Sequence, residues 1–139
     1  MAEARAPQKS LPKVNKVDQT FWEGAANGKF LLQKCASCGK LQFFPRVACV
    51  DCFGELDWVE AKGTGKVHSF TLVRVPRNPA FKDEVPIYYI NVILDEGVIV
   101  ESKLVGAEKE KVKIGDRVKT VFQPTHDPAI KLPCFELAG

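Results

Sequence analysis

The chain has 139 residues and a formal net charge of +3, with 45% hydrophobic and 27% charged residues. This length and composition suit one ordinary globular domain or two small units that share a core. No apolar run approaches the roughly 20 residues of a membrane-spanning helix, and the N-terminus lacks the apolar segment of an export signal. We therefore expect a cytoplasmic protein without membrane spans or disulfides.

The charged residues are spread along the chain and form no strongly basic stretch. Residues 1–34 carry six basic and three acidic side chains, residues 35–60 carry two and four, and residues 61–139 carry twelve and ten. Phosphate contacts supply much of the affinity of nucleic-acid-binding proteins. This distribution therefore disfavours a nucleic-acid partner, although it does not exclude one.

Residues 1–28 are predicted to form a tail followed by a helical arm. The first dozen residues contain two prolines and few apolar side chains, so we assign them no fold. In residues 14–26 the larger apolar side chains recur at spacings near three and four, which is typical of one or two short amphipathic helices. These side chains are Val14, Val17, Phe21 and Trp22. The pair Asn27-Gly28 is a plausible end for the helix.

Four of the five cysteines form two Cys-x-x-Cys pairs within "CASCGKLQFFPRVACVDC": Cys35 and Cys38, then Cys49 and Cys52. Each pair places two thiolates on one side of a tight turn, and two such turns complete the tetrahedral shell of a structural Zn²⁺ site. We therefore predict a zinc ribbon over residues 29–60. Four thiolate ligands leave no position for an activated water, so the metal is expected to hold the chain together. A metal-free ribbon, an iron site and disulfides are the alternatives.

Residues 61–139 contain five β-type runs separated by turn signals. The runs cover residues 66–75, 87–95, 98–105, 117–124 and 130–137. A long proline-containing loop at 76–86 follows the first run, and Asp95-Glu96-Gly97 is a tight-hairpin signal after the second. The predicted fold is therefore mainly β: an N-terminal helical segment, a rubredoxin-like zinc ribbon and a five-stranded barrel of the oligonucleotide/oligosaccharide-binding (OB) type.

No catalytic constellation can be recognised in the sequence. Cys134 lies between apolar residues with no adjacent base, which is typical of a buried structural cysteine. His68 and His126 have no nucleophile motif near them. Asp95 and Glu96 are consecutive in a turn, so we interpret them as solvated acids instead of an acid/base pair.

The sequence does contain residues suited to binding. Aromatic side chains are interleaved with basic ones, and on an OB barrel such residues can stack on and neutralise single-stranded nucleic acid. The near-neutral charge is easier to reconcile with a smaller anionic ligand or with a protein surface. Our candidates for contacts with such a ligand or partner are Arg46, Arg74, Arg77, Lys82, Phe44 and Trp22.

The order and spacing of several segments resemble the acyl-CoA-associated zinc-ribbon/OB-fold protein family. The resemblance begins at about Val17 and rests on "FWEGAANGKFLLQKCASCGKLQFFPRVACVDC", "ELDWVEAKGTGKVHSFTLVRV", "VPIYYINVILDEG" and "KIGDRVKTVF". One departure is the second Cys-x-x-Cys turn (knuckle), "CVDC", where Val50 occupies a position that is often proline in family members.

This resemblance implies a small, non-catalytic subunit of a hetero-oligomer. Its partner would be a thiolase-superfamily enzyme that forms or cleaves carbon–carbon bonds in acyl-CoA substrates and carries the catalytic cysteine and histidines. The nearest analogy is a thiolase of aromatic degradation, such as benzoylsuccinyl-CoA thiolase. Cys35, Cys38, Cys49 and Cys52 would hold the zinc, and acyl-CoA would lie at the subunit interface. A single-stranded nucleic-acid-binding protein and an iron-containing redox ribbon remain the alternative functions.

Overall fold

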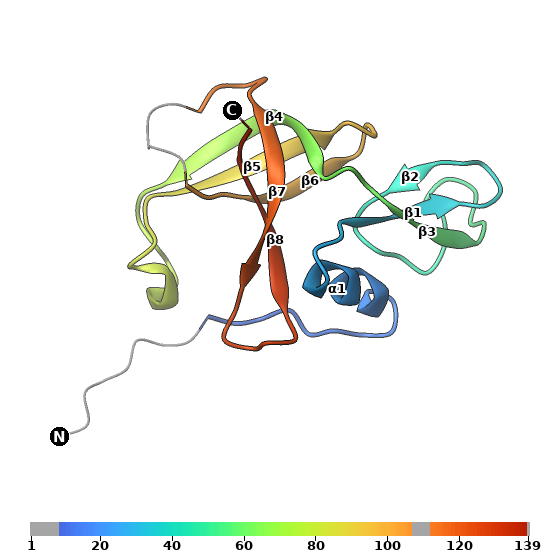
Figure 1. Cartoon of the computed structure of the whole chain (residues 1–139), viewed down its shortest axis with the longest axis horizontal. Helices are drawn as coiled ribbons and strands as arrows, with labels where there is room; N and C mark the ends of the chain where they lie inside the picture. The colour runs from blue at the N-terminus through green and yellow to red at the C-terminus, as the bar shows by residue number, and fades with distance from the viewer. Residues whose placement is uncertain (1–8, 107–111, 139) are drawn as a thin grey trace.

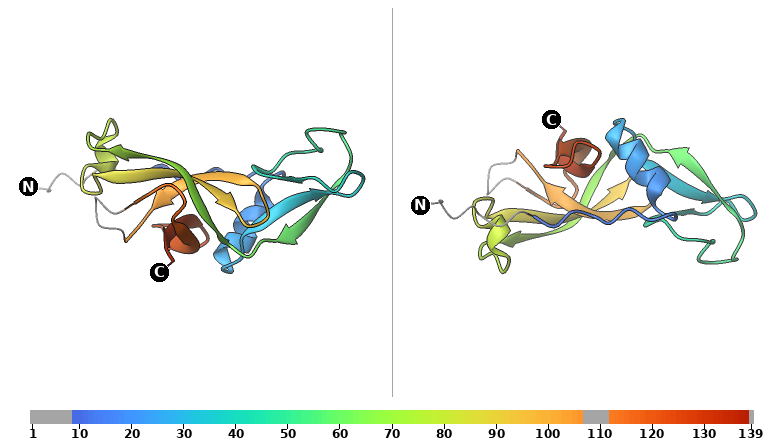
Figure 2. Two further views of the ribbon diagram at one scale, coloured as in Figure 1. Left: turned by 90° about the horizontal axis from the view of Figure 1, so that it is seen from above. Right: turned by 90° about the horizontal axis from the view of Figure 1, so that it is seen from below.

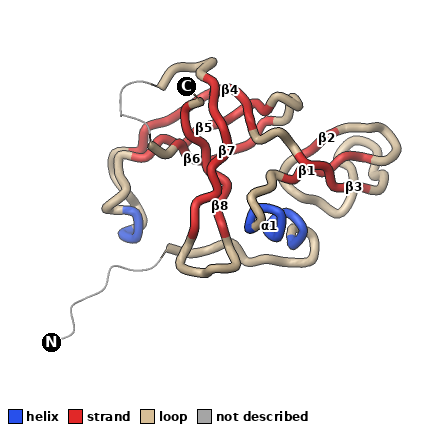
Figure 3. The backbone as a smooth tube through the Cα atoms, in the orientation of Figure 1, coloured by secondary structure: helices blue, strands red, loops and turns tan. Residues whose placement is uncertain are grey.

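A small three-stranded sheet and a closed five-stranded barrel make up most of the fold, with one α-helix between them (Figures 1 and 3). This computed structural model describes residues 9–106 and 112–138. The expected N-terminal tail therefore falls partly outside the described residues. Within the described part of the chain, no helix is long and apolar enough to cross a membrane.

Helix α1 (Gln19–Ala26) packs one face against the rest of the protein. Phe21 and Ala25 are almost completely buried, which explains the apolar spacing seen in the sequence. The helix begins later than the predicted range because Asn15 Oδ1 accepts hydrogen bonds from the backbone N–H groups of Val17 and Asp18. These bonds form a local turn, which competes with helical hydrogen bonding.

The ribbon is an antiparallel sheet with strand order β2-β1-β3. Its strands are β1 (Leu31–Cys35), β2 (Leu41–Gln42) and β3 (Leu56–Glu60). The sequence predicted the two longer strands but not β2, because two residues are too few to show an alternating pattern. Figure 2 shows this sheet at one end of the molecule, with its connecting loops extending away from the barrel.

The barrel closes in the order β4-β5-β6-β8-β7. Its strands are β4 (Thr64–Val73), β5 (Ile87–Leu94), β6 (Ile99–Leu104), β7 (Arg117–Pro124) and β8 (Lys131–Leu137), and a 3-10 turn η1 (Pro79–Phe81) lies in the long β4–β5 loop. The ends of each barrel strand lie within two residues of the predicted ends, so the predicted mainly β, OB-type architecture is confirmed. Gly65 lets β4 pair with both β5 and β7, because a Cβ there would lie 2.4 Å from the Ile93 carbonyl oxygen.

The helix, ribbon and barrel share one hydrophobic core. Phe21 of α1 contacts Phe30, which precedes β1, with ring centroids 5.8 Å apart, and Phe43 of the ribbon at 5.5 Å. Phe30 in turn lies 6.3 Å from Phe135 of β8. The buried cluster contains residues from all three predicted parts of the chain. The division into arm, ribbon and barrel at residues 28 and 60 stays a prediction.

Candidate metal centre and neighbouring cavities

Two matching turns bring the four ribbon cysteines together. In the first, the Gly39 N–H donates to the Cys35 carbonyl oxygen at 3.0 Å. In the second, the Phe53 N–H donates to the Cys49 carbonyl oxygen, also at 3.0 Å. Both residues that end the turns have positive φ, 75° for Gly39 and 59° for Phe53. The two knuckles therefore share one backbone geometry.

The four sulfur atoms are arranged for a tetrahedral metal ion. All of them lie within 4.8 Å of one another. The Cys35 and Cys52 sulfurs are 3.4 Å apart, and those of Cys38 and Cys49 are 3.7 Å apart. Zinc–sulfur bonds of about 2.3 Å in a tetrahedron give sulfur–sulfur edges of about 3.8 Å. The donor set therefore fits Zn²⁺, and its four thiolates close the coordination shell.

The electrostatics of the cluster also require a cation. The Cys38 N–H donates to the Cys35 sulfur at 3.4 Å and lowers the pKa of the Cys35 thiol to about 6. At Cys52 the Gly54 N–H lowers the pKa, but the Cys35 and Cys38 sulfurs outweigh it and raise the value to about 12. Without a cation, four adjacent thiolates would repel one another. A divalent ion allows all four to ionise.

Gly54 keeps space open beside the sulfurs. A Cβ at this position would lie 3.0 Å from the Cys35 sulfur, 3.0 Å from the Ser37 hydroxyl oxygen and 3.2 Å from the Cys52 sulfur. These distances are shorter than ordinary van der Waals contacts. A Cβ at position 54 would therefore require these neighbours to shift by a few tenths of an ångström.

Two buried glutamines, which sequence reasoning did not single out, hold the loops around the cluster. The Gln33 side chain accepts from the Arg46 N–H at 2.8 Å and donates to the Arg46 carbonyl oxygen at 2.9 Å. Gln42 donates to Gln33 at 3.1 Å and accepts from the Val50 N–H at 3.1 Å. Buried polar side chains of this kind fix loop positions, because breaking their bonds leaves unsatisfied groups. No signal in the sequence marks them, because β2 is too short for a pattern and the burial of β1 does not alternate.

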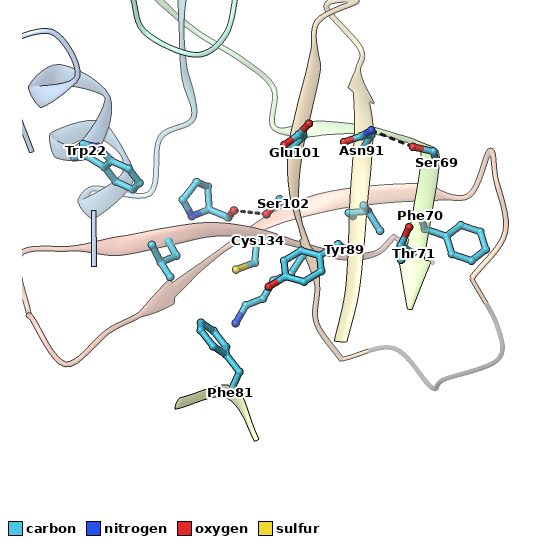
Figure 4. A pocket seen from close by; sticks show the side chains of 14 residues that line it. Trp22, Ser69, Phe70, Thr71, Phe81, Tyr89, Asn91, Glu101, Ser102 and Cys134 are labelled. Carbon is cyan, nitrogen blue, oxygen red and sulfur yellow. Dashed lines mark hydrogen bonds between the residues drawn. The ribbon is translucent and has the colours of Figure 1, made fainter. Parts of the chain in front are cut away.

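A largely apolar cavity of about 560 Å³ lies where α1, the barrel and the β4–β5 loop meet (Figure 4). Trp22 reaches it from α1, Phe81 from η1, Tyr89 from β5 and Cys134 from β8. This volume is within the range of small-molecule sites. The nitrogen Nε1 of Trp22 is buried without a hydrogen-bond partner among the described residues. An acceptor on a ligand or a water would satisfy it.

The polar groups at the edge of this cavity bond to one another. Asn91 donates to the Ser69 hydroxyl oxygen at 3.1 Å, and the Ser102 hydroxyl donates to a β8 carbonyl oxygen at 2.6 Å. Lys103 lies 3.6 Å from Glu84, which also pairs with Lys9 of the N-terminal segment. The cavity thus offers apolar surface with few free charges.

The structure distributes the six predicted contact residues over several places. Arg46 and Phe44 lie on the ribbon, whereas Arg74, Arg77 and Lys82 are exposed around the β4–β5 loop. Arg77 also lines a second cavity of about 320 Å³, which shares residues of that loop with the first. Trp22 of α1, the last of the six, is buried and lines the first cavity.

The remaining cysteine and the histidines do not form a catalytic pair. Cys134 is buried on β8, where burial raises the pKa of its thiol, the opposite of what a nucleophile needs. His68 is exposed on β4, which is not a neighbour of β8 in the barrel, and His126 is exposed in the β7–β8 turn. These placements agree with the prediction of a buried structural cysteine.

Two family models match consecutive parts of the chain. The model described as ChsH2, rubredoxin-like zinc ribbon domain, matches residues 22–58. The model described as ChsH2, C-terminal OB-fold domain, matches residues 58–123. Together with the four convergent sulfurs, the ribbon match confirms the prediction of a structural zinc ion.

Known proteins resemble the chain over most of its length. A probable enoyl-CoA hydratase alpha subunit of Thermomonospora curvata is 38% identical over 130 residues, covering 91% of this chain but 39% of that protein. A DUF35 domain-containing scaffold protein of Methanothermobacter thermautotrophicus is 33% identical over 68% of this chain and 71% of its own length. The solved structure titled "Ltp2-ChsH2(DUF35) aldolase" is 33% identical, with a TM-score of 0.81, and covers 91% of this chain and 98% of the matched chain.

Proposed function

The chain belongs to the DUF35/ChsH2 family of zinc-ribbon and OB-fold proteins, and from this we propose that it is a non-catalytic subunit of an acyl-CoA enzyme complex. The complex forms or cleaves carbon–carbon bonds, and a thiolase-superfamily partner carries the reacting groups. This chain stabilises that partner and contributes to the acyl-CoA site at the interface.

One observation carries the proposal: the five cysteines, all among the described residues, are committed to structure. Four cysteines converge on a closed metal site, and burial raises the pKa of the fifth, Cys134. A closed tetrahedral site has no position for substrate or an activated water. We therefore assign the chemistry to another chain.

Names of similar proteins support a partnered role. One solved structure is titled as an aldolase of Ltp2 with ChsH2, one relative is a probable alpha subunit of an enoyl-CoA hydratase, and another is named a scaffold protein. One name describes a subunit, one describes a scaffold and one joins two protein names in a single aldolase, and only the subunit's name includes CoA. These names support a catalytic partner, and one of them supports a CoA thioester as its substrate.

The β4–β5 loop supports a contact with acyl-CoA. Its exposed basic residues, Arg74, Arg77 and Lys82, suit the phosphates of CoA, since guanidinium and ammonium groups bind phosphate oxygens. Beside them, the rings of Phe81 and Tyr89 line both cavities and offer apolar surface for an acyl chain. On the ribbon side, Arg46 and Phe44 are the candidates for partner contacts. The indole N–H of Trp22, which has no hydrogen-bond partner among the described residues, suits an acceptor on a ligand.

Single-stranded nucleic-acid binding is the second candidate function. Phe70 and Tyr89 are exposed rings on the outer face of the barrel, where bases could stack. Glu101 lines the same surface, however, and acidic groups repel phosphate. Tight, salt-sensitive binding of a fluorescent oligonucleotide would favour this function, and no binding at low salt removes it.

Co-expression with the genes adjacent to its own, followed by native mass spectrometry, tests the proposal. We expect the chain to co-purify with a larger subunit in a fixed ratio and to contain one zinc per chain. Purification of the chain alone, with every adjacent gene product expressed and soluble, would contradict it. A coloured preparation containing iron would point to the redox alternative.

A further inference from the structure

The second zinc knuckle has a phenylalanine where its geometry favours glycine. Gly39 and Phe53 occupy the same position in the two knuckles, as their matching hydrogen bonds and positive φ values show. Glycine adopts this left-handed conformation without a steric penalty, whereas a bulky side chain is strained in it. Residues in strained conformations cluster at functional sites, so the side chain at position 53 is a candidate for function.

The side chain of Phe53 packs little against the rest of the fold. It is 83% exposed, so burial does not explain its presence. Val47, at 84% exposed, and Val50, at 45%, lie in the same stretch of chain. These three residues, here called the knuckle patch, all lie in the connection between β2 and β3, and the connecting loops of the ribbon extend away from the barrel at one end of the molecule (Figure 2).

The knuckle patch is held rigidly despite its exposure. The Val50 N–H is bound by the buried Gln42 side chain at 3.1 Å, and Gln42 is bound in turn to Gln33. The Cys49 N–H donates to the Gly54 carbonyl oxygen at 3.0 Å, which closes the loop that carries Phe53. A preorganised patch loses little conformational entropy when it binds, which suits an anchor residue.

With zinc bound, the ribbon that carries the patch has a net negative charge. Residues 29–60 contain four basic side chains, among them Arg46 beside Val47, and four acidic ones, so the side-chain charges balance. Of the acidic side chains, Asp51 pairs with Lys40 at 2.9 Å, while Glu55 and Asp57 are exposed. Four thiolates around one Zn²⁺ add a net negative charge. The complementary surface is therefore an apolar socket with a rim of lysine and arginine.

We propose that Phe53 is the anchor by which the ribbon docks into a basic-rimmed apolar socket on the catalytic subunit. This inference rests on the proposed function, because the catalytic subunit is the occupant that it names. An exposed aromatic ring on a rigid loop has the character of an interface hot spot. The strain at Phe53 is then retained for binding and contributes nothing to folding.

The substitution Phe53→Gly separates binding from folding, because glycine suits the positive φ. The thermal midpoint of the zinc-loaded chain should equal or exceed that of the wild type. Its affinity for the catalytic subunit recovered from the wild-type complex, measured by isothermal titration, should fall about 30-fold, as for an interface hot spot. Phe53→Asn, which also tolerates this conformation, should behave alike. Ile114→Ser removes a similarly exposed apolar residue from the barrel and should bind like the wild type.

Each other outcome overturns the inference. A lower midpoint for both Phe53 variants would make the ring a structural residue. If the wild-type chain forms its complex and the Phe53 variants bind the catalytic subunit with unchanged affinity, the anchor is refuted and the proposed function stands. Absence of any complex with the wild-type chain would refute both. Sedimentation could instead show that the wild-type chain associates with itself and that Phe53→Gly abolishes this association. That result would assign the patch to a second copy of this chain.

Discussion

At the scale of single residues, Asp95 shows how a turn residue fastens the barrel. Its carboxylate accepts two hydrogen bonds from Arg117, at 2.7 and 3.0 Å, and another from the Thr64 hydroxyl. Arg117 and Thr64 hold the pKa of the Asp95 carboxyl well below its ordinary value. From the sequence, Asp95 is interpreted as a solvated turn acid. The structure instead shows a link between the β5–β6 turn and two other strands.

Replacing Asp95 with asparagine should destabilise the protein in a pH-dependent way. Because the folded-state pKa is depressed, the stabilising contribution is fully present above the unfolded-state pKa of about 3.9. It is lost as the pH falls through the lower folded-state pKa. Thermal unfolding of Asp95→Asn should therefore show a lower midpoint at neutral pH, and a difference from wild type that shrinks steadily below about pH 4. The control is Asp83→Asn, which changes an exposed loop acid. A difference in thermal midpoint between Asp95→Asn and wild type that is equal at every pH would contradict the account.

Some important residues could not be found from the sequence alone. Gln33 and Gln42 look like ordinary polar positions in strands, and only tertiary structure shows that their side chains are buried and bonded to loop backbones. Phe53 did carry a signal, because the first knuckle reads Cys-Gly and the second Cys-Phe. That signal acquires meaning only once both positions are known to have positive φ.

At the scale of elements, the ribbon brings four cysteines together on two turns that a metal ion would join. Spacing alone predicted its four metal-binding cysteines, since two Cys-x-x-Cys turns have few other structural uses. The barrel strands were equally predictable, because each is bounded by clear turn signals. Strand β2 was missed, as two residues carry no periodicity, and the helix began late because Asn15 forms a local turn.

Gly54→Ala should weaken zinc binding without abolishing folding of the barrel. The added Cβ would crowd the Cys35 and Cys52 sulfurs, at 3.0 and 3.2 Å, and push them from tetrahedral geometry. In competition with a chromophoric chelator, we expect the variant to release zinc with at least roughly tenfold lower apparent affinity, which corresponds to about 1.4 kcal/mol. Glu55→Ala is the control, since it changes an exposed side chain next to position 54. Equal zinc retention by both variants would show that the space beside the sulfurs is unimportant.

At the scale of the whole molecule, one core joins the helix, the ribbon and the barrel. The ring contacts from Phe21 through Phe30 to Phe135 fix the ribbon relative to the barrel. The segments that carry the knuckle patch and the β4–β5 loop are consequently joined through one shared core. The composition predicted a shared core as one of two possibilities, but which aromatic residues formed it depended on contacts between distant segments.

The most direct test of a non-catalytic subunit is an activity measurement on separated and recombined proteins. This chain, its co-purifying catalytic subunit and their mixture are each incubated with 3-oxoacyl-CoA and other acyl-CoA thioesters, and the products are followed by chromatography. We predict no turnover by this chain alone and faster turnover by the mixture than by the catalytic subunit alone. Turnover by this chain alone at the rate of the mixture would contradict the account.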